Sequence, residues 1–100
     1  MSMVLIHCQV APGAFSGELQ FEIILNGEKH RGLAARRYVL TTERKPIGEV
    51  TTEVPALIYG RILSDLENGK VLVSIPDGEV VSVKMDKLVL LESRDVPVGS

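Results

Sequence analysis

The residues best equipped for chemistry form a basic group near the middle of the chain. Residues 28–45 hold six lysines and arginines and two glutamates, a net charge of +4, whereas the rest of the chain carries −6. Guanidinium groups bind phosphate bidentately, and a tyrosine among them can stack on a base. The side chains available for an anion or nucleic-acid contact are Arg31, Arg36, Arg37, Tyr38, Arg44 and Lys45. The same charges also suit a solvated strand with local ion pairs, or a surface for a protein partner.

Metal and nucleophile chemistry would depend on His7, Cys8 and His30. Because neighbouring residues of a strand project to opposite faces, His7 and Cys8 cannot readily bind one metal ion. We expect Cys8 to be a small residue of the core and His7 to be solvated. A nucleophilic cysteine–histidine pair would need an exposed thiol. The sequence therefore predicts no metal ligands, no cofactor and no catalytic residues.

Carboxylate pairs and phosphate loops are also missing from the pattern. Glu18 and Glu22 lie on the polar side of one predicted strand, about 13 Å apart at ~3.3 Å per residue, which is too far for paired acid–base chemistry. The sequence has no Gly-x-Ser-x-Gly elbow and no Walker loop.

Composition sets the class of protein. One hundred residues, 45% of them apolar, fit one globular domain with a substantial core. Aromatic residues are few, and Cys8 is the single cysteine, which points to a reducing compartment. The apolar run at 4–6 is too short for a signal sequence or a membrane span. We expect a cytoplasmic protein without membrane contact.

Strands are predicted first in the N-terminal half. Residues 4–10 and 19–25 alternate between apolar and polar side chains, as half-buried strands do. Residues 49–54 alternate in the same way, and their glutamates and threonines predict an exposed or edge strand, which Pro55 separates from the next element.

Residues 30–42 are ambiguous between strand and helix. Their first part favours helix by propensity, whereas the part from Tyr38 onward favours strand. A strand would send Arg36 and Arg37 to opposite faces, and a small barrel cannot bury an unpaired guanidinium. An edge strand, a bulge at the arginine pair or a short helix would each solve this, and we favour a strand with a local irregularity.

Residues 57–91 show the clearest structural pattern. Asn68-Gly69 and Asp77-Gly78 each separate two apolar runs, and such dipeptides favour the positive φ angles of type I′ hairpin turns. The pattern predicts strands at 57–65, 70–76 and 79–84, one helical turn at 85–88 and a short strand at 89–91.

Some of these strands are apolar on both faces, and a small barrel covers only one. Leu57, Tyr59 and Leu63 lie opposite Ile58, Ile62 and Leu66. The second face needs cover, either from the 11–17 and 41–55 loops or from a second subunit. Leu57, Tyr59 and Leu63 are therefore the candidate interface residues.

This arrangement resembles the later part of small SH3-like barrels, including their KOW and Tudor-like branches, in which hairpins lead to a helical turn and a closing strand. The likeness is carried by 60–62, 71–76, 77–79 and 85–88 and covers about a third of the chain. It implies a small β-barrel and informs architecture more than activity.

The sequence as a whole predicts an all-β fold of six to seven short strands, in a single small barrel or packed antiparallel meander that is SH3-like in its C-terminal half. Residues 1–91 would form one domain and 92–100 a polar, mobile tail, and we find no internal repeat. The predicted core comprises Val4, Ile6, Cys8, Leu19, Phe21, Ile23, Ile58, Ile62, Val71, Val73, Ile75, Val81, Val83 and Leu88.

For function, we expect a non-enzymatic module that acts by protein–protein contact, with self-association through its two-sided apolar strands as one form of that contact. The alternative is a nucleic-acid-binding barrel that uses the basic 28–45 segment. The low number of aromatic residues and the net charge of −2 favour the protein partner.

Overall fold

The computed structural model describes residues 3–15, 17–25, 27–65 and 67–90. Within these ranges the chain forms eight strands and two single-turn 3₁₀ helices. The elements are β1 (Met3–Pro12), β2 (Glu18–Leu25), β3 (Glu28–Ala35), η1 (Arg36–Tyr38), β4 (Val39–Leu40), β5 (Val54–Asp65), β6 (Lys70–Ser74), β7 (Val80–Lys84), η2 (Met85–Lys87) and β8 (Leu88–Leu90). No helix in this part of the chain is long and apolar enough to cross a membrane.

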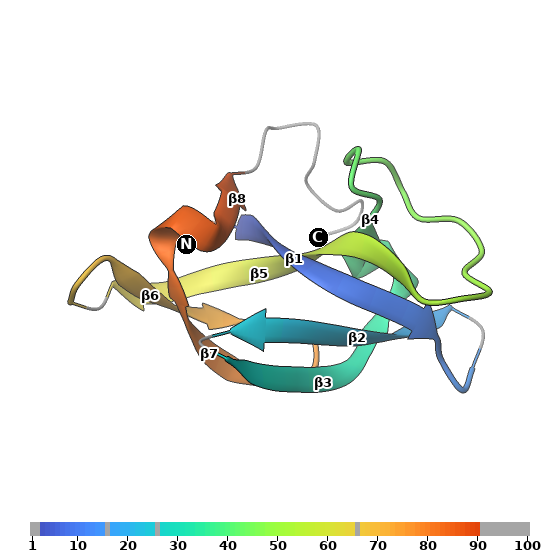
Figure 1. Cartoon of the computed structure of the whole chain (residues 1–100), viewed down its shortest axis with the longest axis horizontal. Helices are drawn as coiled ribbons and strands as arrows, with labels where there is room; N and C mark the ends of the chain where they lie inside the picture. The colour runs from blue at the N-terminus through green and yellow to red at the C-terminus, as the bar shows by residue number, and fades with distance from the viewer. Residues whose placement is uncertain (1–2, 16, 26, 66, 91–100) are drawn as a thin grey trace.

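All the strands belong to one antiparallel sheet that curls into a half-barrel (Figure 1). The main path runs β3-β2-β1-β5-β6-β7, with β4 added to β5 and β8 added to β1. The two long strands, β1 and β5, pair along residues 3–10 and 54–61 and lie at the centre. The all-β antiparallel class is confirmed. The sheet contains two three-stranded meanders, β1-β2-β3 and β5-β6-β7, which are joined through β1 and β5, whereas one meander was expected.

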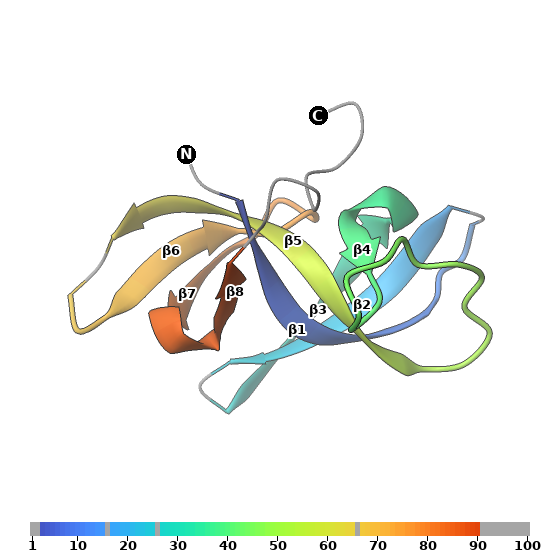
Figure 2. The same ribbon diagram turned by 90° about the horizontal axis from the view of Figure 1, so that it is seen from above.

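The two halves of the chain repeat one arrangement, although the sequence shows no internal repeat. Each half has a long strand, a hairpin, a 3₁₀ turn and a short last strand, and that last strand pairs with the long strand of the other half. The halves lie on opposite sides of the crossing of β1 and β5 (Figure 2). The fold therefore has an approximate two-fold relation between its halves.

The strand pairing fixes which positions of the two halves are equivalent. Leu40 pairs with Leu57 as Val89 pairs with Leu5, and Val39 pairs with Ile58 as Leu88 pairs with Ile6. Ile6 and Ile58 also pair with each other, so they lie at the centre of the relation. The two halves also share a backbone hydrogen bond at the start of each 3₁₀ turn. Arg36 N donates to Gly17 O in the first half, and Met85 N donates to Gly69 O in the second, both at 2.8 Å.

The core fills the inside of the curled sheet with alternate residues of every long strand. The predicted core residues are buried, except that Ile62 and Leu88 are partly buried at its margin. Period-two alternation identified them because one face of each strand is turned inward. Residues 92–100, the predicted tail, lie outside the described residues.

A second, smaller apolar cluster lies on the other face of β1 and β5. It consists of Leu5, Leu40, Leu57 and Tyr59, with Met3, Tyr38 and Val89 packed against it. The short strands β4 and β8 and the turn η1 provide this cover. The second face of β1 and β5 is thus covered mainly by the short last strand of each half and by the η1 turn.

The hairpin turns match the prediction at one site and differ at another. Asn68 and Gly69 have φ angles of 64° and 72°, as a type I′ turn requires. The type I′ turn predicted at Asp77-Gly78 is wrong. Gly78 N donates to Ile75 O, so the central residues of that turn are Pro76 and Asp77, and Gly78 follows with φ 92°. Proline pre-sets the φ angle of the first central residue, which favours a type I turn with glycine after it.

The edge strand predicted at 49–54 is also wrong. Residues 47–53 have no regular structure, and Pro55 lies inside β5, opposite Gln9, instead of separating two elements. Proline is tolerated there because β4 pairs with β5 only at residues 57 and 58, which leaves one side of β5 unpaired at Pro55.

The ambiguous segment 30–42 divides into strand, turn and strand. β3 ends at Ala35, the η1 turn holds both arginines and Tyr38, and β4 follows. A short helix is thus the irregularity, and it keeps both guanidinium groups out of the core.

Candidate interaction surface

A cleft lies where β5 exchanges one neighbour for another. β4 pairs with β5 at residues 57–58 and β6 pairs with it from Arg61, so the strand edge is open near Tyr59 and Gly60. We call this opening the tyrosine cleft. Its volume is about 180 Å³, and its lining includes Met3, Tyr38, Tyr59, Arg61, Ser74 and Pro76.

Tyr38 and Tyr59 reach the cleft from separate parts of the chain. Tyr38 ends the η1 turn, and the pairing of β4 with β5 holds that turn beside the central strand. Tyr59 is only 3% exposed and belongs to the second apolar cluster, against which the half-buried Tyr38 packs. Both rings are therefore held by packing, which favours a preformed surface.

One arginine lines the tyrosine cleft, and a second lies over one of its rings. The guanidinium carbon of Arg37 lies 5.0 Å from the centroid of the Tyr38 ring, and its Nη2 donates to the Tyr38 hydroxyl at 3.3 Å. Arg61 is exposed and lines the cleft from β5. A cation on a tyrosine face gains cation–π attraction, so Arg37 is held against the ring. The cleft thus offers aromatic, apolar and cationic groups together.

The predicted basic residues fall into three places. Arg31 lies on β3 and pairs with Glu22 at 2.7 Å, and Arg36 donates from η1 to the carbonyl oxygen of Gly48. Arg44 and Lys45 lie in a turn after β4, where Lys45 is 4.0 Å from a Glu43 oxygen. Of the predicted set, η1 brings together Arg36, Arg37 and Tyr38. The structure distributes the other three elsewhere.

The predicted interface residues also differ in their surroundings. Leu57 and Tyr59 are buried in the second apolar cluster, whereas Leu63 is 40% exposed at a bulge of β5. The interface assignment stays a prediction. Leu63 has an exposed side chain, Tyr59 is exposed only where it lines the cleft, and Leu57 is covered within the chain.

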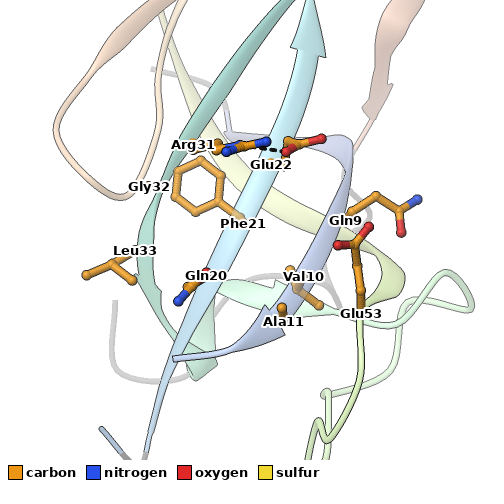
Figure 3. A pocket seen from close by; sticks show the side chains of 10 residues that line it. All are labelled: Gln9, Val10, Ala11, Gln20, Phe21, Glu22, Arg31, Gly32, Leu33 and Glu53. Carbon is orange, nitrogen blue, oxygen red and sulfur yellow. Dashed lines mark hydrogen bonds and ion pairs between the residues drawn. The ribbon is translucent and has the colours of Figure 1, made fainter. Parts of the chain in front are cut away.

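A shallow groove crosses the outer face of β1, β2 and β3 (Figure 3). Its volume is about 390 Å³, and it runs between two rows of paired residues. The rows are Gln9, Glu22 and Arg31 on one side, and Ala11, Gln20 and Leu33 on the other. Glu53 lies at the β1 end. The groove combines an internal ion pair with neutral amides and carries no cluster of one charge.

Cys8 is a core residue, as expected. It is 6% exposed, and burial raises the pKa of its thiol to about 12. Desolvation disfavours the thiolate, which is the reactive form. Among the described residues, no group of three or more His, Cys, Asp or Glu side chains could hold a metal ion.

The meeting of Tyr38 and Tyr59 was not foreseen from the sequence. Each tyrosine was noted separately, one as a base-stacking residue and one as an interface residue. The pairing of a two-residue strand with β5 brings them together, and no periodic pattern marks so short a strand. The available signal was the change from helical to strand propensity at Tyr38.

Searches of family models, curated proteins and solved structures find no match to the chain.

Proposed function

We propose that this chain is a non-enzymatic module that acts by protein–protein contact through the tyrosine cleft. The observation that carries the proposal is the meeting of Tyr38 and Tyr59 beside Arg37 and Arg61 at an open strand edge. Tyrosine and arginine are the residue types that most often dominate binding energy at protein interfaces. Rigid aromatic side chains also lose little conformational entropy when they bind.

The chemistry of the cleft indicates its partner. Met3, Pro76 and the Tyr38 ring supply most of the apolar surface, since Tyr59 is only 3% exposed. The Arg61 guanidinium group supplies positive charge, and that of Arg37 lies over the Tyr38 ring. The expected partner segment therefore places an apolar side chain in the cleft and a carboxylate beside it. Charge complementarity of this kind favours an acidic partner and disfavours a basic one.

The SH3-like relationship and the cytoplasmic location expected from the sequence belong to the same proposal. Hairpins, a 3₁₀ turn and a closing strand occur between residues 57 and 90, as they do in such barrels. Self-association remains one form of the contact, with Leu63 as its exposed apolar residue. Sedimentation equilibrium at high protein concentration tests this form, and a strict monomer would remove it.

The direct test uses a random-peptide phage library with the immobilised full chain. We expect enrichment of peptides that carry an acidic residue next to an apolar one. Arg61→Ala and Tyr38→Ser should each weaken an enriched peptide about tenfold or more, as expected for hot-spot residues. Arg31→Ala is the matched control, because Arg31 pairs with Glu22 away from the cleft.

Two outcomes would refute the proposal. One is a library that yields no specific peptide. The other is a set of enriched peptides that bind Arg61→Ala as tightly as the unchanged chain, since Arg61 is exposed and its removal leaves the fold intact.

Nucleic acid is the second candidate partner, and the Arg37–Tyr38 stack supports it. A ring with a guanidinium group beside it can stack on a base and bind a phosphate. Titration of labelled single-stranded RNA and duplex DNA at ~50 and ~200 mM salt separates the two candidates, because phosphate contacts weaken steeply with salt. An Arg36→Glu, Arg37→Glu variant should abolish such binding, and its absence at low salt would end this alternative.

A further inference from the structure

A second cleft lies beside the place where β1 exchanges neighbours, and its residues His7, Ile24 and Lys87 are equivalent to Tyr59, Pro76 and Tyr38 of the tyrosine cleft. β2 pairs with β1 at residues 9–12 and β8 pairs with it at residues 4–6, so the edge of β1 is open at His7. The opening has a volume of about 450 Å³ and lies between the end of β2 and the β7–η2 segment. We call it the lysine cleft.

The walls of the lysine cleft are apolar. Ile6 comes from β1, Ile24 and Leu25 come from β2, and Val83 comes from β7. Ile24 is 63% exposed although it is a large aliphatic residue, because β1 does not pair with this end of β2. Small-molecule sites are concave, mostly apolar and roughly 300–1,000 Å³ in volume. The lysine cleft is concave and has such a volume, and half of its lining residues are apolar.

The polar groups of the lysine cleft are nearly all basic. His7, Lys84 and Lys87 line it from β1, β7 and η2, and Ser82 adds a hydroxyl. No carboxylate is among its lining residues, although the chain as a whole has a net charge of −2. The basic residues of the lysine cleft are therefore gathered there by the fold, since the chain as a whole is slightly acidic. An anionic group bound at this opening would meet two ammonium groups. A carboxylate, Glu22, lines an adjoining opening that shares His7 and Ile24.

The equivalent positions in the other half carry none of these charges. Ala35 stands in place of Lys84 at the end of the outer strand, Tyr38 in place of Lys87 at the end of the 3₁₀ turn, and Tyr59 in place of His7. The same backbone arrangement thus supports a cationic opening in one half and an aromatic one in the other.

We propose that the lysine cleft binds a small amphipathic carboxylate, such as a medium-chain fatty acid. The apolar walls from β1, β2 and β7 would hold the hydrocarbon body, and Lys84 and Lys87 would bind the carboxylate, which charge-assisted hydrogen bonds stabilise. This site is independent of the tyrosine cleft and of the protein contact proposed there.

Decanoate, below its micellar concentration, is the probe. Titration of the isotope-labelled full chain should give saturable shifts of the backbone amide resonances of Ile24, Ser82, Val83 and Lys84. Acetate has the charge without the apolar body, and decyltrimethylammonium has the apolar body with the opposite charge. Neither should produce these shifts at the same concentration.

Lysine variants test the charge requirement. Lys84→Ala and Lys87→Ala should each raise the dissociation constant of decanoate by about threefold or more, and the pair of changes should raise it further. Lys45→Ala is the matched control, because Lys45 is an exposed lysine in the turn after β4 and does not line the cleft. All three lysines are exposed, so none of these changes should unfold the chain.

Three results would overturn the proposal. The first is the absence of saturable binding. The second is equal binding of decyltrimethylammonium, which would indicate apolar adsorption without recognition of charge. The third is an equal effect of Lys45→Ala and Lys84→Ala, which would indicate a general charge effect. Peptide binding by the lysine variants stays a separate measurement, so failure here would leave the tyrosine-cleft proposal standing.

Discussion

Tyr38 and Lys87 end the two 3₁₀ turns at equivalent positions, and Tyr59 and His7 occupy equivalent positions on the two long strands. In one half the two rings pack into an apolar cluster and leave a cleft of about 180 Å³. In the other half His7 and Lys87 are exposed and line the lysine cleft of about 450 Å³, which also extends along β7. The backbone arrangement is therefore common to both halves, whereas the side chains at the strand exchange decide how much space stays open and with what charge.

The two halves also differ in the side chains of their paired inner strands. Phe21 pairs with Gly32 in the first half, and Val73 pairs with Val81 in the second. A large residue beside glycine and two medium residues side by side fill similar volumes, as close packing demands. The two halves thus reach the same shape with different side-chain volumes.

The largest expected difference between the halves concerns Tyr59 and its equivalent, His7. Tyr59→Ala should lower the free energy of unfolding by about 3 kcal/mol, because it opens a cavity in the second apolar cluster. His7→Ala should change it by less than about 0.5 kcal/mol, because His7 is exposed. Urea denaturation of both variants measures the difference. Equal losses would show that the two positions do not differ in packing as the structure indicates.

A second difference concerns Gly32, whose equivalent Val81 carries a full side chain. A Cβ atom at Gly32 would overlap Asp77 Oδ2 and lie 2.8 Å from Phe21 Cζ. Gly32→Ala should therefore destabilise the chain by about 1–3 kcal/mol through overpacking.

Asp77→Ala tests whether the overlap with Asp77 is the cause of this destabilisation. In this background Gly32→Ala should cost clearly less, since the nearest atom is gone, although Asp77→Ala also removes the bond from Glu79 N to Asp77 Oδ1. A double-mutant cycle separates the two contributions. Strict additivity would contradict the assigned contact.

The smallest expected effect depends on pH and involves Cys8, whose equivalent in the other half is Gly60. Burial raises the pKa of the Cys8 thiol from 9.0 to about 12, so the folded chain retains a proton that the unfolded chain loses. The stability contributed by the protonated thiol is complete below pH 9 and is lost as pH rises from 9 towards 12. At pH 10 the loss should be about 1 kcal/mol.

Urea denaturation between pH 7 and 10.5 measures this loss, with Cys8→Ala as the control that lacks the titrating group. The difference in stability between the unchanged chain and the variant should shrink above pH 9. A difference that stays constant with pH would show that the thiolate is tolerated in the fold.

The sequence predicted the fold class and the inward face of most strands. Alternation at 4–10 and 19–25 was reliable because each strand buries one face, and Asn68-Gly69 was reliable because its positive φ angles are a local preference. Alternation at 49–54 misled, since Val50 is buried from an irregular segment. An alternating pattern of valines indicates which side chains are buried, but a residue such as Val50 can be buried without belonging to a strand.

The tyrosine cleft could be predicted only in its parts. The sequence singled out Arg37, Tyr38 and Tyr59, but no pattern placed Tyr38 beside Tyr59. β4 has two residues, which is too short for a periodic signal, and its pairing with β5 is a long-range contact. The lysine cleft left no signal either, because His7, Ile24 and Lys84 are ordinary outward-facing residues of three separate strands.

The sequence by itself determined an all-β chain, most of its strands, the burial of Cys8 and the turn at Asn68-Gly69, because these follow from local side-chain preferences. Only the tertiary structure decided the repeat of two halves and the exchange of their last strands. The two halves repeat the same strand pairing. Backbone hydrogen bonds form this pairing, and they depend little on which side chains the strands carry. Two sequences without visible similarity can therefore take the same path, and their differing side chains leave an aromatic cleft in one half and a cationic cleft in the other.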